Sequence, residues 1–418
     1  MSWQSQLVAQ LDETKQAAFF LATLSREKKD ESLRFLANLL RRKKLEILEV
    51  NRKDVAKASA SGYQAAFIDR LTLTEERVEK MAGACEDVAD LPDPVGQVTW
   101  RTIRPNGLEI HRVRVPIGVI AIIYESRPDV TIEAAILCLK AGNCAVLRGG
   151  KEAIFSNRLL VELIKQALLE TGIPGASVNL LASGGRQAVP FLLKQTRFID
   201  LVIPRGGESL ITTIVKHSRI PVIKHYKGVC HTYVDAEADI NMALKVTFNA
   251  KVQRPGTCNA TETLLVHRSI APKFLPLMAE KFRLAGVEMR GCPETCKLIP
   301  DAIPARSSDW GQEYLALIIA IRVVNSLSEA IEHITHFGTG HSEAIITNNQ
   351  EAAREFLKKV DAACVYHNAS TRFTDGGQFG LGAEIGISTD RIHARGPMGL
   401  EELTTYKYLI YGQGQVRS

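Results

Sequence analysis

A polar loop at residues 253–261 places Cys258 immediately before an apolar run that is typical of a strand. A thiol at such a junction can be partly exposed and close to backbone N–H groups, and both conditions lower its pKa and make it nucleophilic. Most protein cysteines, however, are small buried hydrophobic residues. The loop marks Cys258 as a candidate covalent catalyst, with a structural role as the alternative.

Two glycine-containing segments could bind phosphate. Residues 148–151 and 205–207 each follow an apolar run and enter a helical stretch. Ligands of open parallel sheets bind at that edge, and helix N-termini beside basic side chains attract phosphate. The sequence contains neither Gly-x-Gly-x-x-Gly nor Gly-x4-Gly-Lys-Ser/Thr. A nucleotide would therefore need an unusual site, and tight turns with a solvated base are the alternative.

Other cysteine and histidine groups are weaker candidates for chemistry. Cys292 and Cys296 have the wrong spacing for a zinc knuckle, and His333, His336 and His341 lack the glutamate of a zinc hydrolase motif. We therefore expect no metal. Four cysteines in apolar surroundings are expected to be buried, namely Cys138, Cys144, Cys230 and Cys364.

Helices and a hairpin are expected before the candidate sites. Apolar residues recur every three to four positions from about residue 3 to residue 90, which predicts amphipathic helices. Residues 98–115 alternate polar and apolar side chains around Asn106-Gly107, which predicts a β-hairpin. Residues 404–411 predict a strand whose partner is either this hairpin or another subunit.

Short β-branched runs alternate with helical stretches from residue 119 onward. This alternation is typical of parallel sheets covered by helices, and it predicts two doubly wound α/β domains. The strands expected in the first domain are residues 119–124, 144–147, 177–181, 199–203 and 222–224. The second set begins near residue 232 and continues at residues 262–266, 315–324 and 344–347.

The composition excludes several classes of protein. A chain of 418 residues with 45% hydrophobic and 23% charged residues predicts a globular protein of two or three domains. The longest mainly apolar stretch, residues 113–124, is too short for a membrane-spanning helix. The net charge of +6 gathers in basic runs at helical spacing, which favour solvated helix faces over a nucleic-acid surface. We expect a cytoplasmic protein with free thiols and no nucleic-acid or membrane partner.

Four motifs occur in the order found in the aldehyde dehydrogenase superfamily. They are residues 116–119, which match its Pro-x-Gly-Val, residues 141–148, which match its Ala-Gly-Asn-x-Val-Val-Leu-Lys, the loop of Cys258, and residues 312–314. The chain therefore resembles this superfamily from about residue 115 to its end. The resemblance implies an α/β fold with two doubly wound domains, one of them Rossmann-like, and a small β oligomerisation flap.

The resemblance also implies how the chain is divided. It assigns residues 1–100 and 116–228 to helices and the cofactor domain, and residues 229–368 to the catalytic domain. Residues 101–115 and 400–418 would form the flap, and residues 369–399 a returning linker. A homodimer or homotetramer is implied by the flap.

Residues 330–345, 368–376 and 395–399 resemble one branch of the superfamily in particular. That branch reduces L-glutamyl 5-phosphate to L-glutamate 5-semialdehyde in proline biosynthesis, with Cys258 implied as the residue that carries a thioester. The alternatives are another acyl-phosphate or aldehyde dehydrogenase of the superfamily, and a thiol-dependent acyltransferase or amidase. An association with the kinase that makes the acyl phosphate is a reasonable hypothesis.

One departure from the wider superfamily concerns a catalytic base. Oxidising members carry a glutamate base where this chain reads His225-Tyr226-Lys227-Gly228. Reduction of an acyl phosphate needs no such base, because hydride rather than water attacks the thioester. The alternative is that His225 substitutes as the base.

The other departures concern the cofactor and the oxyanion. A lysine at 151, where NAD-selective relatives place an acid, removes repulsion toward a 2′-phosphate and predicts NADPH over NADH. The superfamily's oxyanion-stabilising asparagine aligns with Ser126, so the donor could be Ser126 or the backbone N–H of Cys258, with Asn259 as a positioning residue. The cofactor-binding residues implied are Arg148, Lys151, Gly206, Gly207 and Glu313. The substrate carries a phosphate and a carboxylate, and the basic residues near the motifs are Arg127, Lys227, Arg254, Arg372 and Arg395.

Overall fold

The chain folds into two compact units that are each discontinuous in sequence. The computed structural model describes residues 2–417, apart from the side chain of Arg186. The first unit takes in the chain up to Lys224, together with Gly380–Gly386 and the chain from Met398, and the second takes in His225–Phe379 and Ile387–Pro397. The first boundary thus falls shortly before the expected residue 228, and the expected linker 369–399 is shared between both units.

The first unit contains a parallel sheet with the strand order β5-β4-β3-β6. Its strands are β3 (Val119–Tyr124), β4 (Cys144–Arg148), β5 (Val178–Leu180) and β6 (Leu201–Arg205). The chain runs outward from β3 through β4 to β5 and then returns to the other side of β3. This order creates a switch point between β3 and β6, and open α/β sheets bind ligands at the carboxyl ends of such strands.

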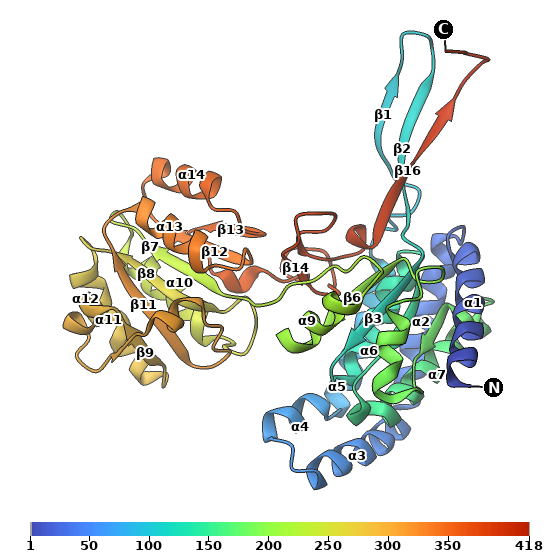
Figure 1. Cartoon of the computed structure of the whole chain (residues 1–418), viewed down its shortest axis with the longest axis horizontal. Helices are drawn as coiled ribbons and strands as arrows, with labels where there is room; N and C mark the ends of the chain where they lie inside the picture. The colour runs from blue at the N-terminus through green and yellow to red at the C-terminus, as the bar shows by residue number, and fades with distance from the viewer. Residues whose placement is uncertain (1, 418) are drawn as a thin grey trace. The chain divides into compact units, whose positions relative to one another are not determined.

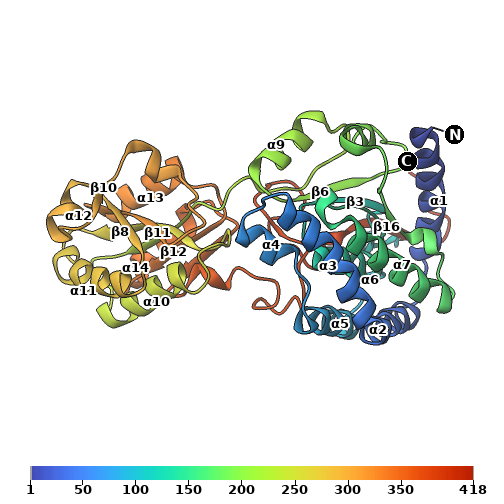
Figure 2. The ribbon, with the colours of Figure 1, turned by 90° about the horizontal axis from the view of Figure 1, so that it is seen from below.

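Helices pack around this sheet (Figures 1 and 2). The predicted amphipathic spacing over residues 3–90 is confirmed, because Leu33, Leu36 and Leu40 of α2 are buried and α2 packs against α5 and α7. The helices of the first unit are α1 (Trp3–Leu21), α2 (Arg26–Arg42), α3 (Lys44–Ala60), α4 (Ala65–Leu71), α5 (Glu75–Asp90), α6 (Pro128–Lys140), α7 (Ile154–Glu170), α8 (Ala188–Leu192) and α9 (Glu208–His217).

A three-stranded antiparallel sheet, here called the flap, also belongs to the first unit (Figure 1). It consists of β1 (Val98–Ile103), β2 (Glu109–Pro116) and β16 (Thr404–Tyr411). The predicted hairpin is confirmed, and the strand at residues 404–411 pairs with β2 of that hairpin. Its partner is therefore within the chain.

The second unit contains a parallel sheet with the order β10-β9-β11-β8-β7-β12-β13. Its strands are β7 (Cys230–Val234), β8 (Thr261–His267), β9 (Glu288–Gly291), β10 (Ile303–Pro304), β11 (Ile318–Val324), β12 (Ser342–Ile346) and β13 (Cys364–His367), with the short pair β14 (Ile387–Ser388) and β15 (Gly396–Pro397) outside it. Its helices are α10 (Ile240–Val252), α11 (Ala271–Leu284), α12 (Pro293–Leu298), α13 (Leu327–Phe337) and α14 (Gln350–Lys359). Large apolar side chains such as Phe274 and Phe282 fill its core. Both predicted α/β sheets are thus confirmed.

One predicted strand is wrong. Residues 222–224 form only an isolated bridge between Val222 and Val202, because the chain leaves the sheet there and passes into the second unit. Over the described part of the chain, no helix combines the length and apolar character needed to span a membrane.

Candidate active site

Cys258 lies in the loop that connects α10 to β8 in the second unit. Cys258 is partly exposed, whereas the four cysteines predicted to be core residues, Cys138, Cys144, Cys230 and Cys364, are buried. All eight cysteines are free thiols. The turn that carries Cys258 is closed by a hydrogen bond of 3.0 Å from the N–H of Ala260 to the carbonyl of Thr257. The loop therefore presents a thiol that is neither buried in the core nor bridged to another cysteine.

Arg372 clamps this loop, hereafter the nucleophile loop. Its Nε donates to Oε1 of Gln253 at 2.8 Å, and its Nη1 donates to Oγ1 of Thr257 at 3.0 Å. Nη1 also donates to Oδ1 of Asn259, and Nδ2 of Asn259 donates to the carbonyl of Thr374 at 2.8 Å. Both ends of the Asn259 amide are engaged inside the unit, so its geometry is that of a residue that positions the loop.

The charge of Arg372 acts on the thiol and on the neighbouring cation. Burial, and then the charge of Arg254, lower the pKa of Arg372, while the charges of Asp375 and Cys258 oppose this. The guanidinium is thus within electrostatic reach of Cys258. A cation at that place favours the thiolate over the thiol.

The backbone of Gly228 packs directly on Cys258. A Cβ atom at position 228 would overlap the carbonyl and the Cα atom of Cys258, so this close approach requires glycine. The N–H of Gly228 donates to Oε1 of Glu313 at 2.9 Å. Glu313, for which the family resemblance implies a contact with the cofactor ribose, therefore holds the segment that lies against the nucleophile.

A buried histidine lies behind the nucleophile. Nδ1 of His341 is 3.6 Å from Sγ of Cys230, and that thiol donates to the carbonyl of Cys258 at 3.1 Å. The ring of His225 lies 5.9 Å from the ring of His341 between centroids. Burial, and then the charge of His225, lower the pKa of His341 to about 3, so His341 is neutral near pH 7.

Three of the five basic residues predicted to bind substrate lie around the nucleophile loop. Arg254 belongs to the loop, Arg372 clamps it, and Lys227 precedes the glycine that packs on Cys258. The remaining two predicted residues, Arg395 and Arg127, are not part of this loop. Arg395 donates from Nη1 to Asp361 at 2.7 Å, and Arg127 is the N-cap residue of α6 in the first unit.

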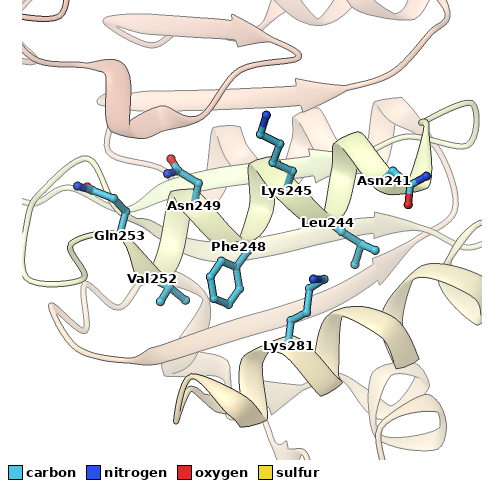
Figure 3. Close-up of a pocket in the computed structure, with 8 residues that line it drawn as sticks. All are labelled: Asn241, Leu244, Lys245, Phe248, Asn249, Val252, Gln253 and Lys281. Atoms are coloured by element: carbon cyan, nitrogen blue, oxygen red, sulfur yellow. The ribbon is translucent and has the colours of Figure 1, made fainter.

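A groove of about 540 Å³ runs along α10, the helix that leads into the nucleophile loop (Figure 3). Leu244, Phe248 and Val252 of α10 and Lys281 of α11 lie on one side of the helix, as Figure 3 shows. The groove ends at Gln253, which is the residue that Arg372 holds. Gln253 therefore both lines the groove and accepts a hydrogen bond from Arg372.

A pocket of about 550 Å³ lies at the carboxyl ends of β3 and β4 in the first unit. A Cβ atom at Gly150 would overlap Oγ of Ser126, so the chain approaches closely here. This edge of a parallel sheet is where nucleotides bind, and the volume suits a small-molecule site. The pocket is lined by Phe67, Ile123, Tyr124, Glu125, Ser126, Arg148, Gly149, Gly150, Lys151, Glu152, Gly185, Val189 and Leu210.

The cofactor residues predicted in the first unit lie in this pocket or beside it. Arg148 and Lys151 are part of its lining. Arg148 donates to the carbonyl of Leu181 at 2.7 Å, which holds one wall in place. Gly206 follows β6, and the N–H of Gly207 at the start of α9 donates to Oε1 of Glu125, a lining residue, at 2.8 Å.

Ser126, predicted as a candidate oxyanion donor, is hydrogen-bonded within the first unit. Its Oγ donates to Oε2 of Glu152 at 2.8 Å, and the hydroxyl of Tyr63 donates to Oε1 of Glu152 at 2.9 Å. Burial opposes ionisation of Glu152, but these hydrogen bonds and the charge of Lys151 together lower its pKa. In this structure Ser126 therefore orders an ionised carboxylate in the pocket.

Two contacts of the site have no counterpart among the predictions. Tyr63 donates to Glu152, and Cys230, which is predicted to be a core residue, donates to the carbonyl of Cys258. Neither contact has a local sequence signal, because each joins residues far apart in the chain. Among residues 2–417, no three or more His, Cys, Asp or Glu side chains are grouped as a metal site would require.

The parallel sheets, the thiol loop and the pocket without a Gly-x-Gly-x-x-Gly motif define a class of enzyme. The family model of the aldehyde dehydrogenase family matches residues 4–294. The chain belongs to the aldehyde dehydrogenase family.

Within this family the chain is similar over nearly its full length to proteins named gamma-glutamyl phosphate reductase. The gamma-glutamyl phosphate reductase of Carboxydothermus hydrogenoformans is 54% identical over 403 residues, which cover 96% of this chain and 97% of that protein. The protein of the same name from Syntrophomonas wolfei is 51% identical and covers 100% of this chain and 99% of its own length. The crystal structure of gamma-glutamyl phosphate reductase from Thermotoga maritima superposes with a TM-score of 0.97 at 50% identity and covers 99% of this chain and 100% of that chain.

Proposed function

We propose that this enzyme reduces L-glutamyl 5-phosphate to L-glutamate 5-semialdehyde, with release of phosphate, in proline biosynthesis. Relatives that are about half identical over nearly the full chain carry the name of that reaction. The observation that carries the mechanism is the partly exposed thiol of Cys258, held against a segment that reads His225-Tyr226-Lys227-Gly228 and contains no glutamate.

In the proposed mechanism Cys258 acts as a thiolate on the γ-carbonyl carbon. The S–C bond forms and the C–O bond to phosphate breaks, which gives a γ-glutamyl thioester and inorganic phosphate without a proton from the enzyme. A nicotinamide dinucleotide, when bound, would supply the hydride that reduces this thioester. The tetrahedral thiohemiacetal oxyanion then expels the Cys258 thiolate, and the aldehyde is released.

The absence of a glutamate before Gly228 protects the thioester. Oxidising relatives use such a glutamate to activate water, whereas here hydrolysis would only waste the intermediate. His225 is the alternative base in that segment. An enzyme in which His225 activates water would oxidise an aldehyde without phosphate, and the experiment below separates the two reactions.

The second unit supplies the charges that the mechanism requires. Arg372 favours the thiolate of Cys258 and fixes the loop that carries it. We assign Arg254 and Lys227, which lie on and beside that loop, to the phosphate and carboxylate of the substrate. Arg395 is engaged with Asp361, so we assign it a structural role.

We propose NADPH as the cofactor, with its adenosine end in the pocket of the first unit. The donor set fits a dinucleotide, because backbone at Gly149 and Gly150 and the basic Lys151 line one pocket at a sheet edge. Both oxygens of Glu152 accept hydrogen bonds from Ser126 and Tyr63, which leaves Lys151 to pair with a 2′-phosphate. Glu313 is assigned to the nicotinamide ribose.

The flap supports a homo-oligomer. Tyr406, Tyr408 and Ile410 project from one face of β16, because alternate residues of a strand point to the same side, and each is more than half exposed. Trp100 pairs with Arg112, which also pairs with Tyr408, so Trp100 lies in the same row. An exposed apolar face of this kind fits a second copy of the chain, as a homodimer or homotetramer.

Two further proposals concern the setting of the enzyme. Eight free thiols suit the reducing cytoplasm, where we place the enzyme.

Because the acyl phosphate hydrolyses readily, its direct transfer from glutamate 5-kinase within a complex would protect the substrate. Association with that kinase is our proposal for a protein partner.

The reverse reaction tests the function. Wild-type enzyme and the Cys258→Ala variant are given pyrroline-5-carboxylate, phosphate and NADP⁺ or NAD⁺, and formation of reduced cofactor is followed by absorbance. The proposal expects reduction that requires phosphate, prefers NADP⁺ and is lost in Cys258→Ala. Reduction that proceeds equally without phosphate would instead identify an oxidising aldehyde dehydrogenase.

A further inference from the structure

A fully buried ion pair brackets the nucleophile loop. Nζ of Lys251, in the last turn of α10, donates to Oε2 of Glu262, the second residue of β8, at 2.6 Å. Both side chains have no solvent exposure. The pair therefore closes the base of the loop that carries Cys258, with one partner on each side of it.

The second carboxylate oxygen of Glu262 binds the chain segment that contains Leu315 and Glu313. Its Oε1 accepts a hydrogen bond of 3.1 Å from the N–H of Leu315. Leu315 has a φ of 52°, a left-handed conformation that is rare for a leucine and needs support from its surroundings. Glu313 lies two residues earlier and holds Gly228 against Cys258. One carboxylate thus connects both segments that flank the nucleophile.

Burying an ion pair costs free energy, because both charged groups lose their hydration. Burial raises the pKa of Glu262 to about 7 and lowers the pKa of Lys251, so each charge is held in place mainly by the other. Apolar residues of similar volume often replace a buried ion pair at no cost in stability. Stability alone therefore does not account for these two residues.

We propose that Lys251 and Glu262 are positioning residues for Cys258, which fix the nucleophile loop at both ends and, through Leu315 and Glu313, the Gly228 wall that packs on it. This inference rests on the proposed function for the identity of the reaction, but the order of the loop can be measured without substrate. Lys251 and Glu262 are assigned no contact with the substrate. Both residues act by keeping the thiol of Cys258 beside Arg372.

The test uses two variants of the full-length enzyme. The double variant Lys251→Met/Glu262→Leu removes both buried charges together, and with them the acceptor of the Leu315 N–H. Glu262→Gln keeps an acceptor for Leu315 and a partner for Lys251 but removes the carboxylate charge. The matched control is Arg283→Met/Asp301→Asn, which removes an exposed pair of the same unit.

Three measurements are made on each variant, namely thermal unfolding, the pH profile of Cys258 alkylation by iodoacetamide, and kcat and KM for NADP⁺ in the phosphate-dependent assay. In the folded double variant we expect kcat to fall by about 100-fold, the scale of a misplaced reacting group, with KM for NADP⁺ little changed. The alkylation midpoint should move to higher pH, because the thiolate lies less close to Arg372. Glu262→Gln should give a smaller loss.

A folded double variant with the alkylation profile and kcat of the wild type would overturn the proposal, as would an equal loss in the control. If the double variant does not fold, the same two measurements on Glu262→Gln test the proposal, and a wild-type alkylation profile and kcat in that variant would overturn it. Should the wild-type enzyme lack phosphate-dependent activity, the proposed function fails, and the alkylation profiles still decide whether the pair positions Cys258.

Discussion

Arg372 has two roles, one in holding the nucleophile loop and one in the electrostatics of Cys258. Its guanidinium bridges Gln253, Thr257 and Asn259, and it lies within electrostatic reach of Cys258. Binding of a substrate anion by Arg372 stays a prediction from the sequence. A planar guanidinium with several donors suits the bridging task in a way that an ammonium does not.

Two substitutions separate the tasks of Arg372. Arg372→Met should raise the pH midpoint of Cys258 alkylation and lower kcat by about 100-fold, because charge and loop geometry are both lost. Arg372→Lys should restore most of the alkylation midpoint but little of kcat, since lysine cannot bridge three acceptors. Full recovery of kcat in Arg372→Lys would show that only the charge matters. Arg283→Met, on the exposed surface, is the control.

The proposed preference for NADPH rests on Lys151. Lys151→Glu should raise KM for NADP⁺ by about tenfold or more, because a 2′-phosphate would meet a second carboxylate beside Glu152. KM for NAD⁺ should change far less. Steady-state kinetics with both cofactors measure the ratio. An unchanged ratio of the two KM values would place the 2′-phosphate elsewhere.

At the scale of elements, the sequence predicts what depends on local patterns. The two parallel sheets, the hairpin around Asn106-Gly107 and the strand at residues 404–411 follow from periodicity and turn chemistry, and they are confirmed. The strand predicted at 222–224 is wrong because whether a short apolar run joins a sheet depends on where the chain goes next. The polar loop by itself predicts Cys258. Gly228 lies just before β7 and Cys230 begins that strand, and no periodicity encodes the contacts of either residue with Cys258.

His341, the residue immediately before β12, should make the second unit sensitive to acid. Its imidazole has a pKa of 6.5 when exposed and about 3 when buried, so the unfolded chain binds an extra proton as the pH falls below about 6.5. The free energy of unfolding should therefore decrease as the pH falls from 6.5 toward 4.5. In His341→Asn this decrease should be smaller by about 1.4 kcal/mol for each pH unit well below 6.5. Urea unfolding at several pH values measures the slope, and an unchanged slope would show that His341 is not buried as a neutral ring.

At the scale of the whole molecule, the chain divides its chemistry between two units. The nucleotide-sized pocket belongs to the first unit, and the nucleophile loop belongs to the second. The flap adds an exposed apolar face to the first unit. Family resemblance indicated the flap, whereas the way in which residues 380–397 are shared between the units has no signature in composition.

The apolar face of the flap should control assembly. Tyr408→Glu introduces a charge into the row of Tyr406, Tyr408 and Ile410, and we expect it to reduce the particle mass measured by light scattering. Lys407→Glu, on the opposite face of the same strand, is the control and should leave the mass unchanged. If both variants keep the mass of the wild type, the flap is not the interface. A reduced mass in both would point to misfolding of β16 instead.

We propose that Cys258 carries a thioester that phosphate, and not water, resolves. The most direct measurement mixes the enzyme with pyrroline-5-carboxylate and NADP⁺ in the absence of phosphate, and follows both NADPH formation and the intact protein mass. We predict a burst of NADPH stoichiometric with active sites, a glutamyl adduct on the peptide that contains Cys258, and renewed turnover when phosphate is added. Continuous NADPH formation without phosphate, or a burst without an adduct on Cys258, would contradict the account.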